Sequence, residues 1–232
     1  GILYCLGELA DKQGSTVIER EKLAESTVGV LELPEEYRSD IESQITTLEI
    51  EGLIKSTTLG DQEAVAISKL YSMEKYIADK LKLLLQSSEE VHLDLDADID
   101  EFERVNNILL HSGQRKAIKT AIEQGVVIIT GGPGTGKTTI IKAILKILTA
   151  RGKQVQLLAP TGRASKRMEE QTGKSASTIH RGLEMGYTNG KLGFTRNENN
   201  PLDADAIIVD EVSMIDLYVA SALLKATRLG TK

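Results

Sequence analysis

Residues 131–138 read GGPGTGKT and fit the pattern G-x-x-x-x-G-K-[ST] between an apolar run and a helix-forming run. Glycines let the backbone curl until successive N–H groups point inward, and the helix that follows contributes the positive end of its dipole. Such a loop grips a chain of phosphates mainly through its main chain. The residues expected to contact a bound nucleotide are Gly132, Pro133, Gly134, Thr135, Gly136, Lys137, Thr138 and Thr139.

Two carboxylates can supply the metal ligand and the proton acceptor that hydrolysis of a nucleotide requires. Asp210 ends an apolar run 73 residues after Lys137, and Glu211 follows it. Thr138 and Asp210 are expected to hold Mg2+, while Lys137 bridges the outer phosphates and Glu211 takes a proton from the attacking water. A second carboxylate is typical of ATPases that hydrolyse to do work, rather than of GTPase switches. We therefore expect ATP and Mg2+ as cofactors, with Lys137 and Glu211 as catalytic residues.

Gln114 lies 17 residues before Gly131, at the start of a predicted helix. Its amide can form two hydrogen bonds with the edge of adenine, which would favour adenine over guanine. The alternative is a solvent-facing residue at a helix start, and the sequence leaves both interpretations open.

The elements that must position these residues follow the pattern of an α/β fold. Helix-forming and apolar strand-forming runs alternate after residue 104, and this alternation predicts a parallel sheet with helices on both faces. The predicted strands are 126–130, 154–159 and 206–210, and the predicted helices include 106–125 and 137–152.

The N-terminal part has a different pattern. Three helical runs, 2–14, 19–27 and 34–54, precede two strand-like runs, 53–57 and 63–68, with a turn between the strands. This outline predicts a small, mostly helical, winged-helix-like domain. We expect an accessory domain over 1–86, with Ile41, Ile45, Leu48 and Ile50 on the buried face of its third helix, then an acidic linker over 87–103 and a second domain over 104–232.

Charge divides along the chain in the same way. Residues 1–100 hold 9 of the 28 basic and 22 of the 34 acidic residues, so this part carries a net charge of -13 and the remainder carries +7. The part that holds the phosphate loop can therefore bind a polyanion, although the whole chain is at -6. The single cysteine permits no internal disulfide, and no run is long enough to span a membrane, so a cytoplasmic protein without membrane contact is expected.

Five segments occur in an order that resembles the first motor domain of superfamily 1 DNA helicases, most closely the RecD-like branch. They are SGQRKAI, GGPGTGKTT, LLAPTGRASKRM, STIHRGL and IIVDEVSMID, between residues 105 and 220. The resemblance implies a RecA-like P-loop fold and ATP-dependent movement along single-stranded DNA from 5' to 3', with unwinding of a duplex fork ahead. The acidic N-terminal part resembles the accessory region of stand-alone RecD-like enzymes.

The resemblance also assigns candidate DNA contacts. Hydroxyl, N–H and guanidinium groups after a strand suit DNA phosphates, which position a strand without reading its sequence. Without the resemblance, His180 would be interpreted as a polar residue at a helix start. The candidate DNA-binding residues are Pro160, Thr161, Gly162, Arg163, Thr178 and His180.

An inserted β-hairpin is predicted at about 184–200, around the turn Asn189-Gly190, which favours type I' geometry. Tyr187 and Phe194 flank the turn where an aromatic ring can meet the face of a base. In similar helicases a hairpin here acts as a wedge at the fork, and residues 186–196 are the hypothetical pin. A surface hairpin without function is the alternative.

Helicases of this type close the ATP site with a second motor domain, which supplies arginines to the transferring phosphoryl group. The sequence stops soon after Glu211, so that domain is an expected partner, and this chain alone should hydrolyse ATP slowly and not unwind DNA. Two other interpretations stay open: a nucleotide-gated DNA-binding or loading module that does not translocate, and a ring-forming P-loop ATPase. The acidic N-terminal region suits a protein partner better than DNA.

Overall fold

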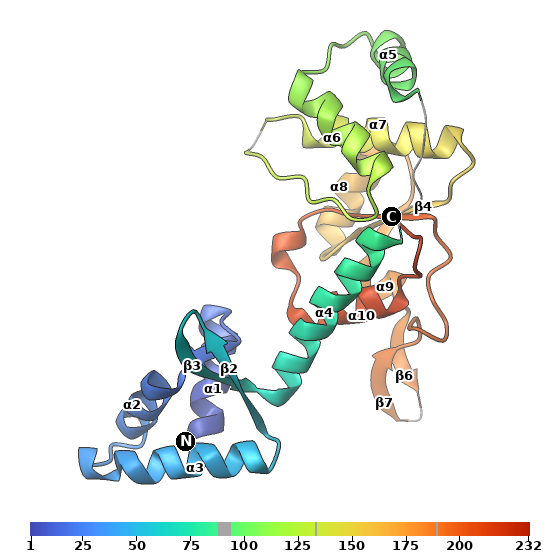
Figure 1. Cartoon of the computed structure of the whole chain (residues 1–232). Coiled ribbons are helices and arrows are strands. Elements are labelled where there is room, and N and C mark those ends of the chain that lie inside the picture. The colour runs from blue at the N-terminus through green and yellow to red at the C-terminus, as the bar shows by residue number, and fades with distance from the viewer. Residues whose placement is uncertain (88–93, 133, 189) are drawn as a thin grey trace. The chain divides into compact units, whose positions relative to one another are not determined.

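The computed structural model describes residues 1–87, 94–132, 134–188 and 190–232, which form two compact units, Gly1–Tyr76 and Ile77–Lys232 (Figure 1). The helix α4 (Ser68–Gln86) begins in the first unit and continues into the second. Among the described helices, none combines the length and the apolar character that crossing a membrane requires.

The first unit combines three helices with a three-stranded antiparallel sheet in the order β1-β3-β2. This arrangement agrees with the predicted winged-helix-like domain, and β1 is an element that the sequence pattern did not reveal. The elements are α1 (Ile2–Gln13), β1 (Val17–Glu19), α2 (Arg20–Val30), the 3-10 helix η1 (Glu35–Tyr37), α3 (Arg38–Ile50), β2 (Ile54–Leu59) and β3 (Gln62–Ile67).

Apolar residues at helical spacing build the core of this unit. Ile41 and Ile45 of α3 are buried, and Leu48 is half-buried against them, as their spacing predicts. Ile50 is 82% exposed, so its predicted place on the buried face is wrong: it is the last residue of α3, and the chain turns at Gly52 with φ +74°. The free Cys5 is half-buried against the same core.

The second unit contains a parallel sheet in the order β5-β4-β8, which confirms the predicted α/β class. Its strands are β4 (Val155–Ala159), β5 (Ala176–Thr178) and β8 (Ala206–Val209), with an antiparallel hairpin of β6 (Met185–Thr188) and β7 (Lys191–Phe194). Its helices are α5 (Leu95–Asn106), α6 (Ser112–Glu123), α7 (Lys137–Ala150), α8 (Gly162–Thr172), α9 (Ile179–Gly182), the 3-10 helix η2 (Val212–Met214) and α10 (Leu217–Ala226).

The predicted strand 126–130 is wrong, because this segment has no regular structure. Ile129 packs against the core, but Ile128 is 77% exposed. A strand exists only through the ladder of hydrogen bonds to a neighbour, and within the described chain β8 pairs with β4 alone. The apolar run therefore enters the phosphate loop as irregular chain.

The acidic segment predicted as an exposed linker over 87–103 contains a helix from Leu95 onward, while 88–93 lie outside the described residues. Leu95, Ile99 and Phe102 of α5 are buried in the main core of the second unit. The carboxylates between them face basic residues of the neighbouring helices, so the charge that suggested a solvated linker holds a helix in place. The predicted helix 106–125 begins later than expected, since α5 ends at Asn106, Asn107 has a left-handed backbone and α6 spans Ser112–Glu123.

Ion pairs connect α5 with α6. The guanidinium of Arg115 contacts Asp96 at 3.1 Å, Asp100 at 2.6 Å and Glu103 at 2.7 Å, and the ammonium of Lys119 contacts Asp96 at 2.6 Å. Hydrogen bonds from Lys119 and Arg115 hold the pKa of Asp96 below its usual value, and Asp100 raises the pKa of Arg115. Both shifts favour the charged forms of Asp96 and Arg115.

Candidate nucleotide and nucleic-acid site

The phosphate loop leads into the N-terminus of α7, with Gly136 as the residue before the helix. Gly134 and Gly136 have φ of +77° and +83°, a conformation that favours glycine. The ammonium of Lys137 donates to the carbonyl oxygens of Gly131 and Gly132, at 2.5 and 2.8 Å, so it lies over the loop itself. A cation in this place, next to the positive end of a 14-residue helix, suits a polyphosphate.

Gln114 contacts the phosphate loop directly. Its amide nitrogen donates to the carbonyl oxygen of Thr135 at 3.1 Å, and its amide oxygen accepts from the backbone N–H of His111 at 2.9 Å. His111 in turn accepts from Gly113 through Nδ1, which completes a capping box at the start of α6. The role of His111 was missed from the sequence, although a Gln three residues after a cap is a known sign of this motif.

A cavity of about 290 Å3 brings these groups together. Apolar side chains line it beside the amide of Gln114 and the ammonium of Lys137, which is the mixture expected where a flat base and its phosphates bind. Its lining residues are His111, Gly113, Gln114, Ala117, Ile129, Thr130, Thr135, Lys137 and Ile140. Gln114 and the phosphate loop, which were predicted separately to contact the nucleotide, thus line the same cavity.

The predicted metal ligands are oxygen donors of the kind that Mg2+ takes together with phosphates and water. The hydroxyl of Thr138 donates to the amide oxygen of Gln171 at 3.3 Å, and a carboxylate oxygen of Asp210 accepts from the backbone N–H of Glu211 at 3.0 Å. Both donors are half-buried, and neither is committed to an ion pair within the described chain. The oxygen atoms of Thr138 and Asp210 therefore suit Mg2+ by their chemistry. No hydrogen bond joins these two residues in the described chain.

Glu211 follows β8 with a left-handed backbone, φ 54° and ψ 40°. This conformation is uncommon for a residue other than glycine and is often found at functional sites. The backbone N–H of Asp210 still continues the ladder to the carbonyl of Leu158 at 3.0 Å, so the chain turns sharply between the two acids. The side chain of Glu211 is exposed, while that of Asp210 is half-buried.

The candidate DNA contacts lie at the same edge of the sheet as the two acids. Ala159 pairs with Thr178 and Leu158 with Val209, so the carboxyl ends of the three parallel strands are aligned. Thr161 and Thr178 cap the helices that follow β4 and β5, each accepting a backbone N–H at 3.2 Å. This edge is where open parallel sheets bind ligands. Pro160, Gly162, Arg163 and His180 belong to the same two turns.

The β6–β7 hairpin forms as predicted around Gly190, while Asn189 lies outside the described residues. Tyr187 is 79% exposed. Phe194 is half-buried, with its ring 5.8 Å from that of His180 and 5.6 Å from that of Tyr218. Phe194 therefore anchors the hairpin to α9 and α10, and its contact with a base stays a prediction.

Residues 114–232, more than half of the chain, match the family of AAA domains. The chain belongs to this family. The match begins at Gln114 and includes the phosphate loop, both threonine caps and the two acids.

Relatives of this AAA domain are RecD-like helicase proteins, as the five segments predicted. The ATP-dependent RecD2 DNA helicase of Deinococcus radiodurans is 46% identical over 107 residues, which cover 46% of this chain and 14% of the relative. The RecBCD enzyme subunit RecD of Haemophilus influenzae is 33% identical over 190 residues, 70% of this chain and 28% of the relative. The same subunit of Mycolicibacterium smegmatis is 37% identical over 142 residues, which cover 51% of this chain and 26% of the relative. The chain spans less than a third of the length of each.

Proposed function

We propose that this AAA domain binds ATP with Mg2+ and, as part of a RecD-like DNA helicase, couples ATP hydrolysis to 5' to 3' movement along single-stranded DNA. The observation that carries the proposal is the common carboxyl edge of β5, β4 and β8, where two threonine-capped turns and the pair Asp210-Glu211 follow adjacent strands. Groups proposed to hold DNA phosphates would then lie one and two strands from the acids proposed to hydrolyse ATP.

In the nucleotide site, each group has a distinct task. Binding of the triphosphate draws the ammonium of Lys137 from the loop carbonyls to the outer phosphates, and Gln114 turns its amide toward adenine. Thr138 and Asp210 hold Mg2+, whose charge would offset that of the phosphates. Glu211 accepts a proton from the attacking water.

In the nucleic-acid site, the exposed guanidinium of Arg163 and the turns at Thr161 and Thr178 hold the tracking strand by its phosphates. The hairpin, on which Tyr187 is exposed, separates the two strands of the duplex ahead. A second motor domain of the same protein would close the nucleotide site, and the acidic first unit would contact a protein. The relatives named as subunits of RecBCD are consistent with a role in DNA recombination or repair.

The test is the variant Glu211→Gln in the complete protein. It removes the proton acceptor and keeps the size of the side chain, so we expect nucleotide binding within about twofold of the unchanged protein and ATP hydrolysis slowed roughly 10^2- to 10^4-fold. Hydrolysis is measured with and without single-stranded DNA. Unaltered hydrolysis in this variant would contradict the assigned role.

Translocation is tested separately by displacement of streptavidin from either end of an oligonucleotide. Faster release from the 3' end, dependent on ATP, is expected for 5' to 3' movement. DNA binding gated by nucleotide without release from either end would favour a loading module, and assembly into a closed ring would favour the ring-forming ATPases.

A further inference from the structure

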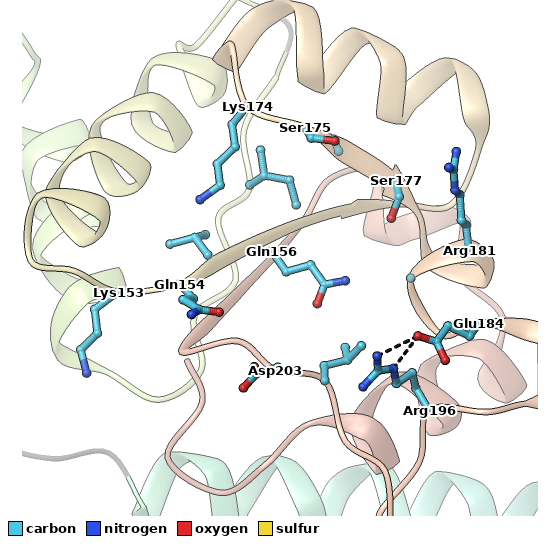
Figure 2. Close-up of a pocket in the computed structure, with 15 residues that line it drawn as sticks. Lys153, Gln154, Gln156, Lys174, Ser175, Ser177, Arg181, Glu184, Arg196 and Asp203 are labelled. Carbon is cyan, nitrogen blue, oxygen red and sulfur yellow. Dashed lines mark hydrogen bonds and ion pairs between the residues drawn. The ribbon is translucent and has the colours of Figure 1, made fainter.

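A second and larger cavity, of about 690 Å3, lies in the second unit beside the start of β4 and along β5 (Figure 2). None of its lining residues is a predicted catalytic, nucleotide, metal or DNA contact. Polar side chains predominate among them: Lys153, Gln154, Gln156, Lys174, Ser175, Ser177, Arg181, Glu184, Arg196 and Asp203, with Val155, Leu157, Ala176, Gly182 and Leu202 between them.

The charged residues of this cavity are of two kinds. Each acidic residue of the cavity forms an ion pair with an arginine: Glu184 contacts Arg196 at 2.7 Å, and Asp203 contacts Arg228 at 3.4 Å. The side chains of Lys174 and Arg181, in contrast, form no ion pair or hydrogen bond with the described part of the chain. The cavity therefore has two positive charges without an internal counterion, and an anion is the ligand that they suit.

Neutral donors add to these two cations. The amides of Gln154 and Gln156 have no partner among the described residues, and Figure 2 shows Gln156 projecting from near the start of β4 into the cavity. Gly182 forms part of the wall and lets α9 approach closely, because a Cβ there would lie 2.6 Å from Cδ2 of Leu158. A phosphate diester, which accepts hydrogen bonds and carries one charge per unit, matches this set of groups.

The two unpaired cations do not converge on one point. Lys174 precedes β5 and Arg181 follows it, and the extended run from Ser175 to Thr178 between them rises by roughly 10 Å. Figure 2 shows the two side chains pointing apart, that of Lys174 toward the start of β4 and that of Arg181 at the other end of β5, so one small anion is a poorer match for both. A chain of phosphates matches both, because successive groups would meet successive cations.

The cavity also reaches the base of the hairpin. Glu184, which precedes β6, and Arg196, which follows β7, lie in its wall and bind each other through Nε at 2.9 Å and a second nitrogen at 2.7 Å, as Figure 2 shows. Arg196 also donates to the carbonyl oxygen of Pro201 at 3.1 Å. The root of the hairpin is thus held at the border of the cavity, so the cavity directly adjoins the hairpin.

We propose that this cavity binds the backbone of the displaced DNA strand, the strand that the hairpin separates from the tracking strand. The inference rests on the proposed function, because it requires that the hairpin part a fork. Lys174 and Arg181 contact two phosphates of the displaced strand, and Gln156 donates to a third group between them.

The test compares two forked DNA molecules that share a duplex and a 5' single-stranded tail, of which one also has a 3' tail on the other strand. Binding of the 232-residue chain is measured by fluorescence anisotropy over a range of salt concentrations. Each phosphate contacted on a single strand steepens the logarithmic salt dependence by about 0.7, so two contacts should make the two-tailed fork steeper by about 1.4. The double variant Lys174→Gln/Arg181→Gln should lose this difference and bind the one-tailed fork as before.

The matched control is Lys55→Gln/Lys69→Gln, which removes two positive charges from the first unit and should leave both salt dependences unchanged. If the unchanged chain shows equal salt dependences for the two forks, this inference is overturned while the proposed function stands. The same holds if the cavity variant affects both forks equally. Competition by poly-glutamate as strong as that by single-stranded DNA would assign the cavity to an acidic protein instead and overturn it too. Absence of binding to either fork would overturn the proposed DNA-binding function together with this inference.

Discussion

Glycine at position 136 is required by two independent features of its surroundings. Its φ of +83° is strained for any other residue, and a Cβ there would lie 2.2 Å from the amide nitrogen of Gln114. That amide nitrogen holds the carbonyl of Thr135, so the shape of the phosphate loop and the position of the proposed adenine contact depend on each other. The loop pattern predicts glycine here, but the contact with Gln114 is visible only in the fold.

Gly136→Ala should therefore weaken ATP binding by displacing both the loop and Gln114. We expect a loss of at least about tenfold in affinity, which corresponds to roughly 1.4 kcal/mol, with the fold retained. Nucleotide binding by isothermal titration calorimetry checks this. Gly29→Ala is the control, because a Cβ at Gly29 meets nothing within 4 Å. Affinity within twofold for both variants would show that the close approach of Gln114 is dispensable.

Among the elements, α5 best shows how charge and burial act together. Its apolar residues enter the core, and its acidic residues meet Arg115 and Lys119 of α6. Glu103 is only 11% exposed and also accepts the backbone N–H of Leu110 at 2.6 Å. Because α6 carries Gln114, the docking of α5 supports the helix that positions the proposed adenine contact.

Arg115→Met should destabilise the second unit, since it leaves the largely enclosed carboxylate of Glu103 and the neighbouring carboxylates without the guanidinium that they share. The expected loss is about 1–2 kcal/mol of unfolding free energy, below the cost of breaking a fully buried pair because Arg115 remains 25% exposed. Urea denaturation measures it. Arg104→Met is the matched control on α5 itself: the side chains of Arg104 and Glu101 are 73% and 58% exposed, so loss of their ion pair should leave the stability nearly unchanged. Equal losses would contradict a structural role for the Arg115 cluster.

At the scale of the whole molecule, the two units have separate cores and different charges. The core cluster of the first unit holds nine buried apolar residues, and residues 1–76 hold 7 basic and 15 acidic residues, a net charge of -8. The groups proposed to hold DNA all belong to the second unit. A winged-helix-like domain of this charge suits a protein surface better than a polyanion.

Residues 1–76 produced alone should fold cooperatively and should not bind single-stranded DNA at physiological salt. The reason is that phosphate binding requires basic groups that release counterions, and this unit has a large excess of carboxylates. Circular dichroism during thermal unfolding and fluorescence anisotropy with a labelled oligonucleotide measure the two properties. Binding as tight as that of the 232-residue chain would move the DNA site to the first unit and favour the loading-module interpretation.

The local pattern of the sequence was sufficient for the phosphate loop, the α/β class, the winged-helix-like outline and the hairpin, because each depends on residues close together in the chain. Spacing within a loop or a helix is a local property. Other features depend on partners distant in sequence: the pairing that 126–130 lacks, the basic residues that fold the acidic segment into α5, and the rings that engage Phe194. The cavity with Lys174 and Arg181 is of this second kind as well, since its walls come from separate segments that only the sheet brings together.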